Sequence, residues 1–587
     1  MIVPMKKIAV ILEAKDAHRA LGTLRSLGIL HVEYLRPPAS SQTASLQQDY
    51  ALLSEAIAIL GAPEFKDVSA DASTKPYDWK ACARRIIDSY KRLDQLNEYL
   101  VTMRQRIVEW EPWGDFDPAA LVALTQHGIV VKLYQIPRAE IKNIPPAIIV
   151  KEICVREKRV HCALINREKV EVPFKEVMPS KMSLAAMRER LNHDQRTIAT
   201  IRKDIARHTV LRARLQDTRA AIVHELEFQK ALVGMGQEGA LSYITGYIPF
   251  DTVGKLKEAS RIHQWALSVS DPGSEDAVPT LIRNPRWVSL IEPIFKLIEV
   301  TPGYRELDIS IWFLIFFSIF FGMLIGDAGV GLVFMILTAF FQRKAARKGV
   351  KTPIFILFHI LSLCAIIWGV LTGTFFGQVW LPVWIKPLVP ALRNERNVQV
   401  LCFFLGATHL TIAHLWRAVL KFPALRAFAD VGWIIILWVG FFLAKALVLG
   451  DAFPAFGLWF FISGAVLVIT CADPQKNILK GLANGFGGFL LSVVNSFTDV
   501  VSYIRLFAVG LASVAVADAF MLMALEIGHK NIFSTIAMSV VLIAGQALNV
   551  VLGPMAVLVH GVRLNVLEFC GHVDVKWSGF EYKPLAE

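Results

Sequence analysis

Hydrophobic and polar residues are distributed differently in the two halves of this 587-residue chain. Residues 1–300 are rich in charge, and their apolar residues recur singly or in short runs, as in a protein with an aqueous surface. Residues 309–570 contain several apolar runs longer than about 18 residues, the length that spans a bilayer. We therefore predict a cytoplasmic domain, residues 1–300, followed by a membrane domain, residues 301–587.

Two βαβ units are predicted at the ends of the cytoplasmic domain. Residues 6–12 (KKIAVIL) and 29–35 (ILHVEYL) have the pattern of buried strands, and residues 15–27 between them have that of an amphipathic helix. The order strand, helix, strand recurs over residues 241–270. Two such units make one split, ferredoxin-like sheet. The first apolar run is too short for a signal peptide, so the N-terminus is expected to stay in the cytoplasm. This proximal lobe comprises residues 1–60 and 236–290.

The long insertion between the two units is predicted to form a rod and a second lobe. Residues 80–112 and 181–235 place apolar residues at helix-face spacing among many charges. Apolar seams this narrow indicate an antiparallel coiled coil. Residues 113–180 alternate apolar and polar positions and form a strand-rich distal lobe. The predicted fold is thus an α/β region of two lobes joined by a coiled coil; a single compact domain is disfavoured because the rod helices are too polar to be buried.

The membrane domain is predicted to be all-α. Cations concentrate in the loops after the even-numbered spans, which places those loops and both termini in the cytoplasm. The last two spans have about 40 residues, or ~60 Å of helix, so this final pair must tilt, bend or protrude. The eight predicted transmembrane helices are 309–326, 328–342, 353–372, 397–416, 427–449, 455–472, 485–524 and 531–570.

Composition narrows the function further. The net charge is +12, but many cations of the membrane domain cluster in loops between spans, so a nucleic-acid partner is not expected. The seven cysteines form no CxxC pair, and no metal site is expected. The sequence has no GxxxxGK[ST] loop, HExxH or GxSxG motif. We expect that this chain has no catalytic site of its own and binds no cofactor.

Arg505 lies near the middle of the seventh predicted span, too far from either end to reach water by extending its side chain. Arginine stays protonated in essentially any protein environment, and a charge at this depth costs at least a few kcal/mol. It must face a polar cavity or an anion. Thr498 and Ser502 lie within about 60° of it on a helical wheel, so one stripe of this helix is polar. A structural ion pair with a neighbouring carboxylate is the alternative.

Arg563 is the second intramembrane arginine, with His560 one turn before it and Glu568 five residues after it. If the last two spans turn near residue 530, Arg563 lies about 13 Å nearer the cytoplasm than Arg505. Pairing of Arg563 with Glu568 for structural reasons is again the alternative. Gln546 and Asn549 supply neutral hydrogen-bonding groups to a water-filled path.

Other polar residues of the predicted spans give weaker signals. Asp499 and Asp518 project from other faces of the seventh span than Arg505, and either lines an aqueous half-channel or pairs with a neighbouring helix. Asp327, in GDAG, is expected to cap a helix at a tight turn. His359, His409 and His414 are interpreted as satisfied core groups, although each could also relay protons. Lys445 is interpreted as a side chain that extends to the membrane interface.

Five segments in this order resemble subunit I of bacterial and archaeal V/A-type ATPases, the counterpart of the eukaryotic V-ATPase a subunit. The resemblance covers the full chain, and its most specific parts are the YIRL and HxxRL segments. The five are FFGMLIGDAGVGL (320–332), GTFFG (373–377), GATHLTIAHL (406–415), SYIRLFAVGLA (502–512) and HGVRLNVLEF (560–569).

The resemblance implies an ion-translocating stator subunit, non-catalytic itself, in the cell membrane of a prokaryote. Its partners would be a rotor ring of small proteolipid subunits, peripheral stalk subunits, the bilayer, and a translocated H⁺ or Na⁺. Arg505, assisted by Arg563, would face the rotor carboxylates between two offset half-channels.

The chain departs from the family pattern at the start of the first span, which reads Asp308-Ile309-Ser310, at Val330, where the family has tyrosine, and at two positions that carry a carboxylate in relatives. Gly553 stands where eukaryotic relatives carry a glutamate, and Leu491 and Ser492 stand where relatives place a carboxylate. Asp499 or Asp518 is hypothesised to substitute. Two other function classes compete. A secondary transporter would bind an anion at Arg505, but its expected inverted repeats are not found. A scaffold would tolerate lysine at position 505.

Overall fold

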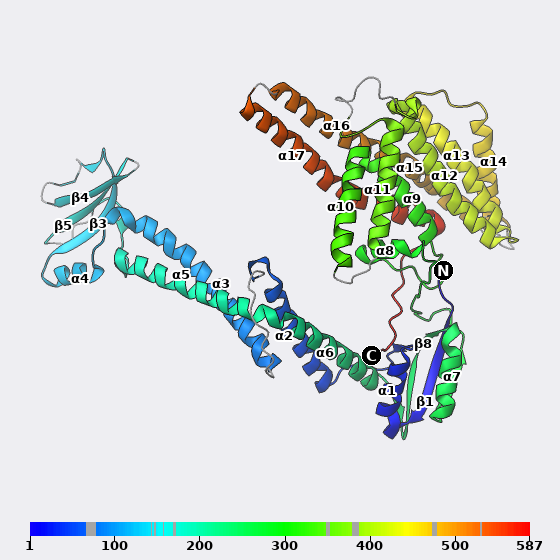
Figure 1. Cartoon of the computed structure of the whole chain (residues 1–587), viewed down its shortest axis with the longest axis horizontal. Helices are drawn as coiled ribbons and strands as arrows, with labels where there is room; N and C mark the ends of the chain where they lie inside the picture. The colour runs from blue at the N-terminus through cyan, green and yellow to red at the C-terminus, as the bar shows by residue number, and fades with distance from the viewer. Residues whose placement is uncertain are drawn as a thin grey trace. The chain divides into compact units, whose positions relative to one another are not determined.

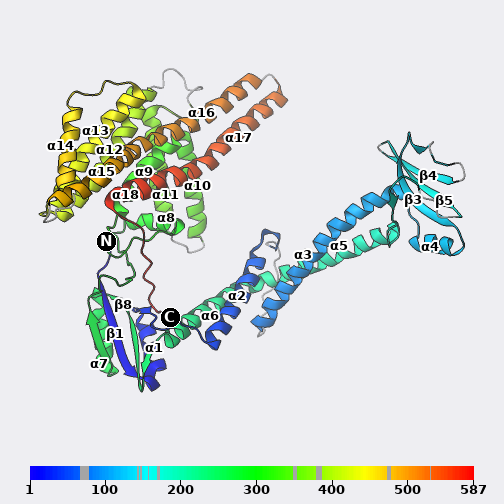
Figure 2. The same ribbon diagram turned by 180° about the vertical axis from the view of Figure 1, so that it is seen from behind.

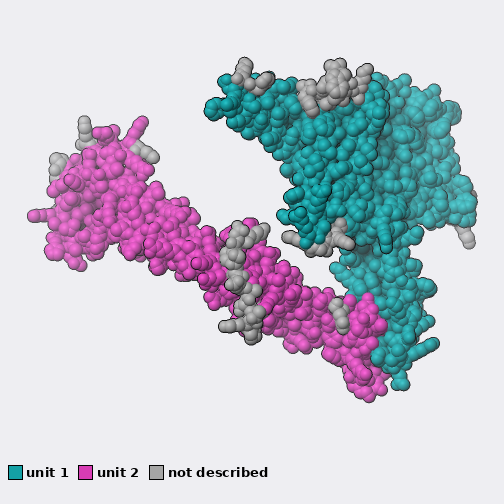
Figure 3. Space-filling model, viewed as in Figure 1, with its two compact units in different colours: residues 1–9, 29–31, 246–584 teal, residues 10–28, 32–245, 585–587 magenta. Residues whose placement is uncertain are grey.

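The computed structural model describes the chain apart from residues 66–77, 142–143, 146–147, 157, 168–171, 348–352, 378–386, 472–477, 529–530 and 587, and apart from the side chains of 478–488. Two compact units result (Figure 3). Unit 1 comprises residues 1–9, 29–31 and 246–584, and unit 2 comprises residues 10–28, 32–245 and 585–587.

The two predicted βαβ units form one sheet. Its strands are β1 (Met5–Glu13), β2 (His31–Glu33), β8 (Leu241–Pro249) and β9 (Ala266–Ser270), in the order β2-β8-β1-β9, with β7 (Gly236–Glu238) beside β8. The helices are α1 (Ala17–Leu27) and α7 (Val253–Ile262). The two strands of each βαβ unit are separated by a strand of the other βαβ unit, which confirms the split arrangement of the sheet.

Unit 2 contains the rod. Its helices are α2 (Ser41–Gly61), α3 (Trp79–Trp110), α5 (Leu184–Arg207) and α6 (Arg212–Val233). Helix α3 packs on α5, while α2 packs on α6 and α3. Arg85 pairs with Asp204 at 3.0 Å, and Glu111 pairs with Arg188 at 2.9 Å. Partner numbers fall as α3 advances, so the two helices are antiparallel. Their supercoiling as a coiled coil stays a prediction.

The middle of the rod contains more than two helices. Leu53, Ile57 and Leu60 of α2 form one buried cluster with Ile86 of α3 and Leu215 of α6. Residues 41–60, predicted within the proximal lobe, therefore pack with the rod helices. The hydrophobic pattern alone did not reveal this, because a seam of apolar residues does not identify its partner helix.

The predicted distal lobe contains a four-stranded antiparallel sheet in the order β4-β5-β3-β6. Trp113 packs edge-on against His161 of this sheet, with ring centroids 4.9 Å apart. Burial lowers the pKa of His161. The elements are α4 (Pro118–Gln126), β3 (Val130–Pro137), β4 (Ile149–Arg156), β5 (Arg159–Asn166) and β6 (Glu176–Val177).

Unit 1 contains the apolar helices. Among the described residues, six segments are long and apolar enough to cross a membrane, two of them with 39 and 42 residues. Helices α9 and α14 are apolar but shorter. Six of the eight predicted spans thus have the required length and composition, and the total of eight stays a prediction. The helices are α8 (Glu292–Leu297), α9 (Ser310–Ile325), α10 (Ala328–Ala346), α11 (Ile354–Thr372), α12 (Glu395–Lys421), α13 (Arg426–Leu449), α14 (Gly457–Cys471), α15 (Ile478–Ser502), α16 (Ile504–Ile527), α17 (Ile532–Ala556) and α18 (Cys570–Val573).

The two longest segments are interrupted helices. The seventh predicted span divides at Tyr503 into α15 and α16, and α17 continues into two π-helical stretches, Val557–Gly561 and Leu564–Phe569. Helices α16 and α17 lie side by side in both views (Figures 1 and 2). The predicted turn near residue 530 lies outside the described residues.

Helix α9 is the centre of the apolar core. Most of its residues are buried on all sides, which explains why it shows no polar face. It ends at Gly326, whose φ of +70° favours glycine. The next residue, Asp327, accepts the backbone N–H groups of Gly329 and Val330 and so caps α10, as predicted. It also accepts the N–H of Phe376 and of Gly377.

The segment after α18 returns to the N-terminal part of unit 1. The Thr280 N–H donates to the Phe580 carbonyl at 2.8 Å, and the Tyr582 N–H donates to the Thr280 carbonyl at 3.0 Å. The Tyr582 hydroxyl donates to the Ile29 carbonyl. The sequence pattern gave no sign of these contacts.

Candidate functional site

Arg505 and Arg563 meet at one carboxylate. The Arg505 guanidinium donates to Glu568 Oε1, and Arg563 Nε lies 3.7 Å from the same oxygen. Glu568 is only 5% exposed, whereas the side chains of Arg505 and Arg563 are 23% and 54% exposed. Arg505 Nε also donates to the Ser502 carbonyl at 3.0 Å, which fixes the guanidinium against the end of α15.

The helix type brings Arg563 and Glu568 together. In an α-helix, residues five apart point about 140° apart, because each residue turns by ~100°. Residues Leu564–Phe569 are π-helical, with bonds between residues five apart, so this spacing returns to one face. Arg563 can therefore reach Glu568 from its own helix while Arg505 reaches it from α16.

The predicted offset of about 13 Å between the two arginines refers to their backbone positions along the helices, and it stays a prediction. The contacts show that both side chains reach one carboxylate oxygen.

The charges at this centre do not cancel. Two guanidinium groups and one ionised carboxylate leave one net positive charge, carried by side chains that are partly exposed. A residual cation in a mostly apolar region favours the approach of a further carboxylate. The alternative interpretation, a structural ion pair, receives some support, because Glu568 contacts both arginines.

Ser502 extends the centre toward Asp499. Its hydroxyl lies 3.2 Å from Glu568 Oε1 and 2.8 Å from the Asp499 carbonyl. Thr498 is exposed and donates to the Val494 carbonyl of its own helix, without a contact to Arg505. The buried Nδ1 of His560 has no partner among the described residues.

Gln546 and Asn549 lie away from the arginines. Asn549 is buried and donates to the Ser513 carbonyl at 3.1 Å, which ties α17 to α16. Gln546 donates to the Phe376 carbonyl at 3.5 Å. Their lining of a water-filled path stays a prediction; what the structure shows is that each links α17 to a neighbouring segment.

Asp518 lies at a separate hollow of about 280 Å³. The hollow is lined by residues of α9, α11, α12 and α16, among them Glu395, the first residue of α12, and by Arg393 just before α12. Asp518 follows Arg505 by thirteen residues, and Asp499 precedes it by six, so the two aspartates lie on opposite sides of the arginine along the chain.

A chain of buried polar side chains starts at Asp499. Its Oδ2 lies 3.1 Å from His572 Nε2, and His572 Nδ1 lies 2.8 Å from His414 Nε2. His414 Nδ1 in turn lies 3.2 Å from Asp430 Oδ1. Sequence reasoning had included His414 only as a weak candidate and had not included His572 or Asp430. Residues from four separate segments meet here, and no local pattern connects them.

The other weak candidates have ordinary partners. His409 is buried, lies 2.8 Å from the Tyr503 hydroxyl and stacks on Phe316 and Phe569. His359 bonds Gln342 at 2.9 Å. Lys445 lies 3.2 Å from Asp451.

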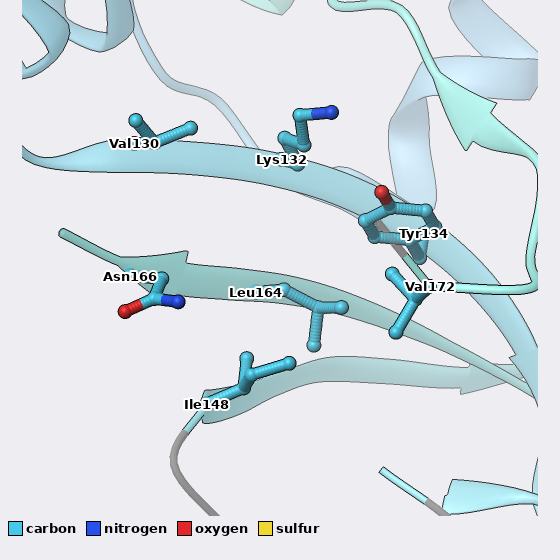
Figure 4. A pocket seen from close by; sticks show the side chains of 7 residues that line it. All are labelled: Val130, Lys132, Tyr134, Ile148, Leu164, Asn166 and Val172. Atoms are coloured by element: carbon cyan, nitrogen blue, oxygen red, sulfur yellow. The ribbon is translucent and has the colours of Figure 1, made fainter. Parts of the chain in front are cut away.

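A cavity in the distal sheet is too small to be a ligand site (Figure 4). Its volume is about 20 Å³, and a single water needs roughly 10–15 Å³. The apolar side chains of Ile148, Leu164 and Val172 and the ring of Tyr134 surround it. Among the described residues, no group of three or more His, Cys, Asp and Glu side chains is arranged to hold a metal ion.

Comparisons with known proteins give relatives over the whole chain. The chain is 30% identical to "V-type ATP synthase subunit I 1" of Treponema pallidum, covering 100% of both proteins. It is 29% identical to "V-type ATP synthase subunit I" of Borreliella burgdorferi, covering 100% of this chain and 99% of the relative. No family model matches. A crystal structure of the cytoplasmic N-terminal domain of subunit I, homolog of subunit a, of V-ATPase aligns with 45% of this chain and 99% of that chain, at 18% identity and a TM-score of 0.22, too low to support a structural argument.

Proposed function

Because the chain belongs to the family of V-type ATP synthase subunit I, we propose that it is the ion-translocating stator subunit in the membrane sector of a rotary ATPase. The single observation that carries this proposal is the net positive charge at Arg505, Arg563 and Glu568, on side chains that remain partly exposed. A structural ion pair needs only one arginine for each carboxylate, whereas here two arginines share Glu568.

The proposed partner of this charge is a carboxylate on each subunit of a rotor ring. A fixed cation lowers the pKa of a carboxylate that passes it, and so favours release of the bound ion at that point. The same charge opposes direct passage of a cation through the stator. Ring rotation would then be the only way for an ion to pass from one side of Arg505 to the other.

Two offset paths to the ring are needed, one from each side of the membrane. We assign the path on the external side to the hollow beside Asp518, and the path on the cytoplasmic side to Asp499. This fits the predicted topology, in which α15 begins and α16 ends on opposite sides. Both aspartates would stand in for the carboxylates that this chain lacks at positions 491 and 553.

The cytoplasmic domain is proposed to bind peripheral stalk subunits. The long antiparallel pair α3 and α5 leads to the distal sheet, and its exposed faces carry ion pairs. Such a rod suits transmission of torque to stalks. Chemistry on ATP would belong to other subunits of the complex.

The test is ATP-driven ion uptake into vesicles that carry the whole complex. Arg505→Ala is expected to abolish uptake while the complex still assembles, and Lys445→Ala, which removes a cation that faces Asp451, is expected to leave it unchanged. Uptake preserved in Arg505→Ala would overturn the proposal. Normal uptake in Arg505→Lys would instead favour the scaffold reading. Uptake that continues without ATP hydrolysis would favour a secondary transporter.

A further inference from the structure

The polar chain runs from Asp499 through His572, His414 and Asp430 to Lys421, and its two ends are more accessible than its middle. His414 and Asp430 are 4% and 3% exposed, and His572 is 8% exposed. Asp499 is 32% exposed at one end. At the other end Lys421, 35% exposed, donates to Asp430 Oδ2 at 2.7 Å. The residues come from the four helices α12, α13, α15 and α18.

Counting hydrogens shows that this chain needs one extra proton to complete its hydrogen bonds. Each of the three contacts between Asp499, His572, His414 and Asp430 joins two atoms that lack a fixed hydrogen, so each requires one proton. Two neutral imidazoles bring one N–H each, and two carboxylates bring none. The chain is complete only when it carries one proton more than these neutral imidazoles and ionised carboxylates supply.

Two carboxylates and two cations act on an extra proton in this chain. The carboxylates attract it, and the cations that face Asp430 are Arg417, 3.5 Å from Oδ1, and Lys421. These cations repel a proton from Asp430 toward the Asp499 end of the chain. Arg417 also donates to the His572 carbonyl at 2.8 Å, which fixes the backbone beside the imidazole.

We propose that the transported ion is a proton and that it passes between the cytoplasm and the rotor-facing surface along Asp430, His414, His572 and Asp499. This inference rests on the proposed function and names its ion and one of its two paths. In the predicted topology, Lys421 and Asp430 lie at the cytoplasmic ends of α12 and α13. Asp499 lies at the other end, linked through its carbonyl and Ser502 to the arginine centre.

One passage conserves protons and charge. Lys421, which is exposed to water, gives a proton to the Asp430 carboxylate and regains one from water, and the Asp430 carboxyl group passes a proton to His414 Nδ1. His414 Nε2 gives its own proton to His572 Nδ1, and His572 Nε2 gives its proton to Asp499. Asp499 releases it to the rotor carboxylate. One proton enters and one leaves; rotation of the two imidazole rings restores their starting tautomers.

The experiment compares His414→Gln and His572→Gln in the complete complex. Glutamine can hydrogen-bond on both sides, but its amide does not pass a proton from one atom to the other as an imidazole does. His359→Gln is the matched control, because it removes a histidine of α11 that bonds only Gln342 among the groups described here. ATP-driven uptake is followed with a pH-sensitive dye, alongside ATP hydrolysis and assembly.

The relay predicts that uptake falls about tenfold or more in both variants, in line with loss of a proton-transfer group. Uptake by His359→Gln should equal that of wild type. Added imidazole, a small diffusible proton carrier, should restore part of the lost rate. Asp499→Asn, at the partly exposed end, should show the same loss and the same rescue without disturbing the buried bundle.

Three results would overturn the relay. Unchanged uptake in both glutamine variants would do so, while Arg505→Ala remains inactive and the stator function stands. Loss of uptake without imidazole rescue, together with normal uptake in Asp499→Asn, would show that the histidines only hold the bundle together. ATP-driven uptake of Na⁺ instead of H⁺ would also overturn it. Uptake preserved in Arg505→Ala would be a failure of the proposed function itself.

Discussion

Two long antiparallel helix pairs in this protein have opposite surfaces. In α3 and α5 the seam is apolar, with Leu96, Leu100 and Ile198 in contact, and the ion pairs lie on the outside. In the pair formed by α15–α16 and α17–α18 the outer faces are apolar, and the polar contacts lie between the helices. The difference shows that each helix pair buries the groups that its surroundings do not solvate: apolar side chains in α3 and α5, and polar side chains in the membrane pair.

The comparison also explains where function can arise. Water solvates the charges of α3 and α5, so their ion pairs contribute little and leave the geometry unspecified. In an apolar surrounding, each polar group must find a partner, which fixes its position. Arg505 and Glu568 are held in one place for this reason, and a fixed charge is what ion transfer requires.

The largest effect is expected at Glu568. Glu568→Ala leaves the guanidinium groups of Arg505 and Arg563 without their shared partner, at a cost of about 3–5 kcal/mol. We expect a marked fall in the thermal midpoint of the purified protein in detergent. Glu526→Ala, which removes an exposed carboxylate of α16, is the control and should change the free energy of unfolding by less than about 0.5 kcal/mol. Equal midpoints for the two variants would contradict the role assigned to the polar seam.

A charge in the apolar seam of the rod should come next. Leu100→Asp places a carboxylate among Leu96 and Ile198 and is expected to cost about 3 kcal/mol. Amide hydrogen exchange in α3 and α5 should accelerate. Val101→Asp, one residue along on the exposed side of α3, should exchange as the wild type does. Similar exchange in both variants would mean that the two faces of α3 do not differ as described.

A neutral contact in the membrane seam should have a smaller effect. Asn549→Ala removes the bond to the Ser513 carbonyl, at a cost of about 1–3 kcal/mol. Its thermal midpoint should fall by less than that of Glu568→Ala. Ser539→Ala, which removes a hydroxyl bonded only within α17, is the control. A larger loss for Asn549 than for Glu568 would reverse the order that charge and burial predict.

The smallest effect is expected at the rod surface. Arg85→Ala breaks an exposed ion pair with Asp204 and should cost no more than about 1 kcal/mol. A double-mutant cycle with Asp204→Ala gives the coupling energy directly, and that energy should decrease as salt is added. A coupling as strong as that of Arg505 with Glu568, unaffected by salt, would remove the distinction between the two helix pairs.

The sequence by itself determined the local features of this protein. Period-2 and helix-face patterns located the strands of the split sheet, the rod helices and the apolar segments, since each pattern depends on neighbours within a few residues. The cost of an unshielded arginine singled out Arg505 without any structure. The helix cap at Asp327 also followed from the residues beside it.

Only the tertiary structure decided which distant groups meet. The π-helical turns bring Arg563 and Glu568 toward one face, a pairing that the sequence left open as an alternative, and the contact of Arg505 with the same carboxylate depends on how the helices pack. Asp430, His414, His572 and Asp499 come from separate segments, so their contacts depend on how helices pack. The return of residues 575–584 to the strands near Thr280 has the same origin. Hydrophobic patterns record which face of a segment is buried, whereas the partner across that face is set by packing and hydrogen bonding over long separations in sequence.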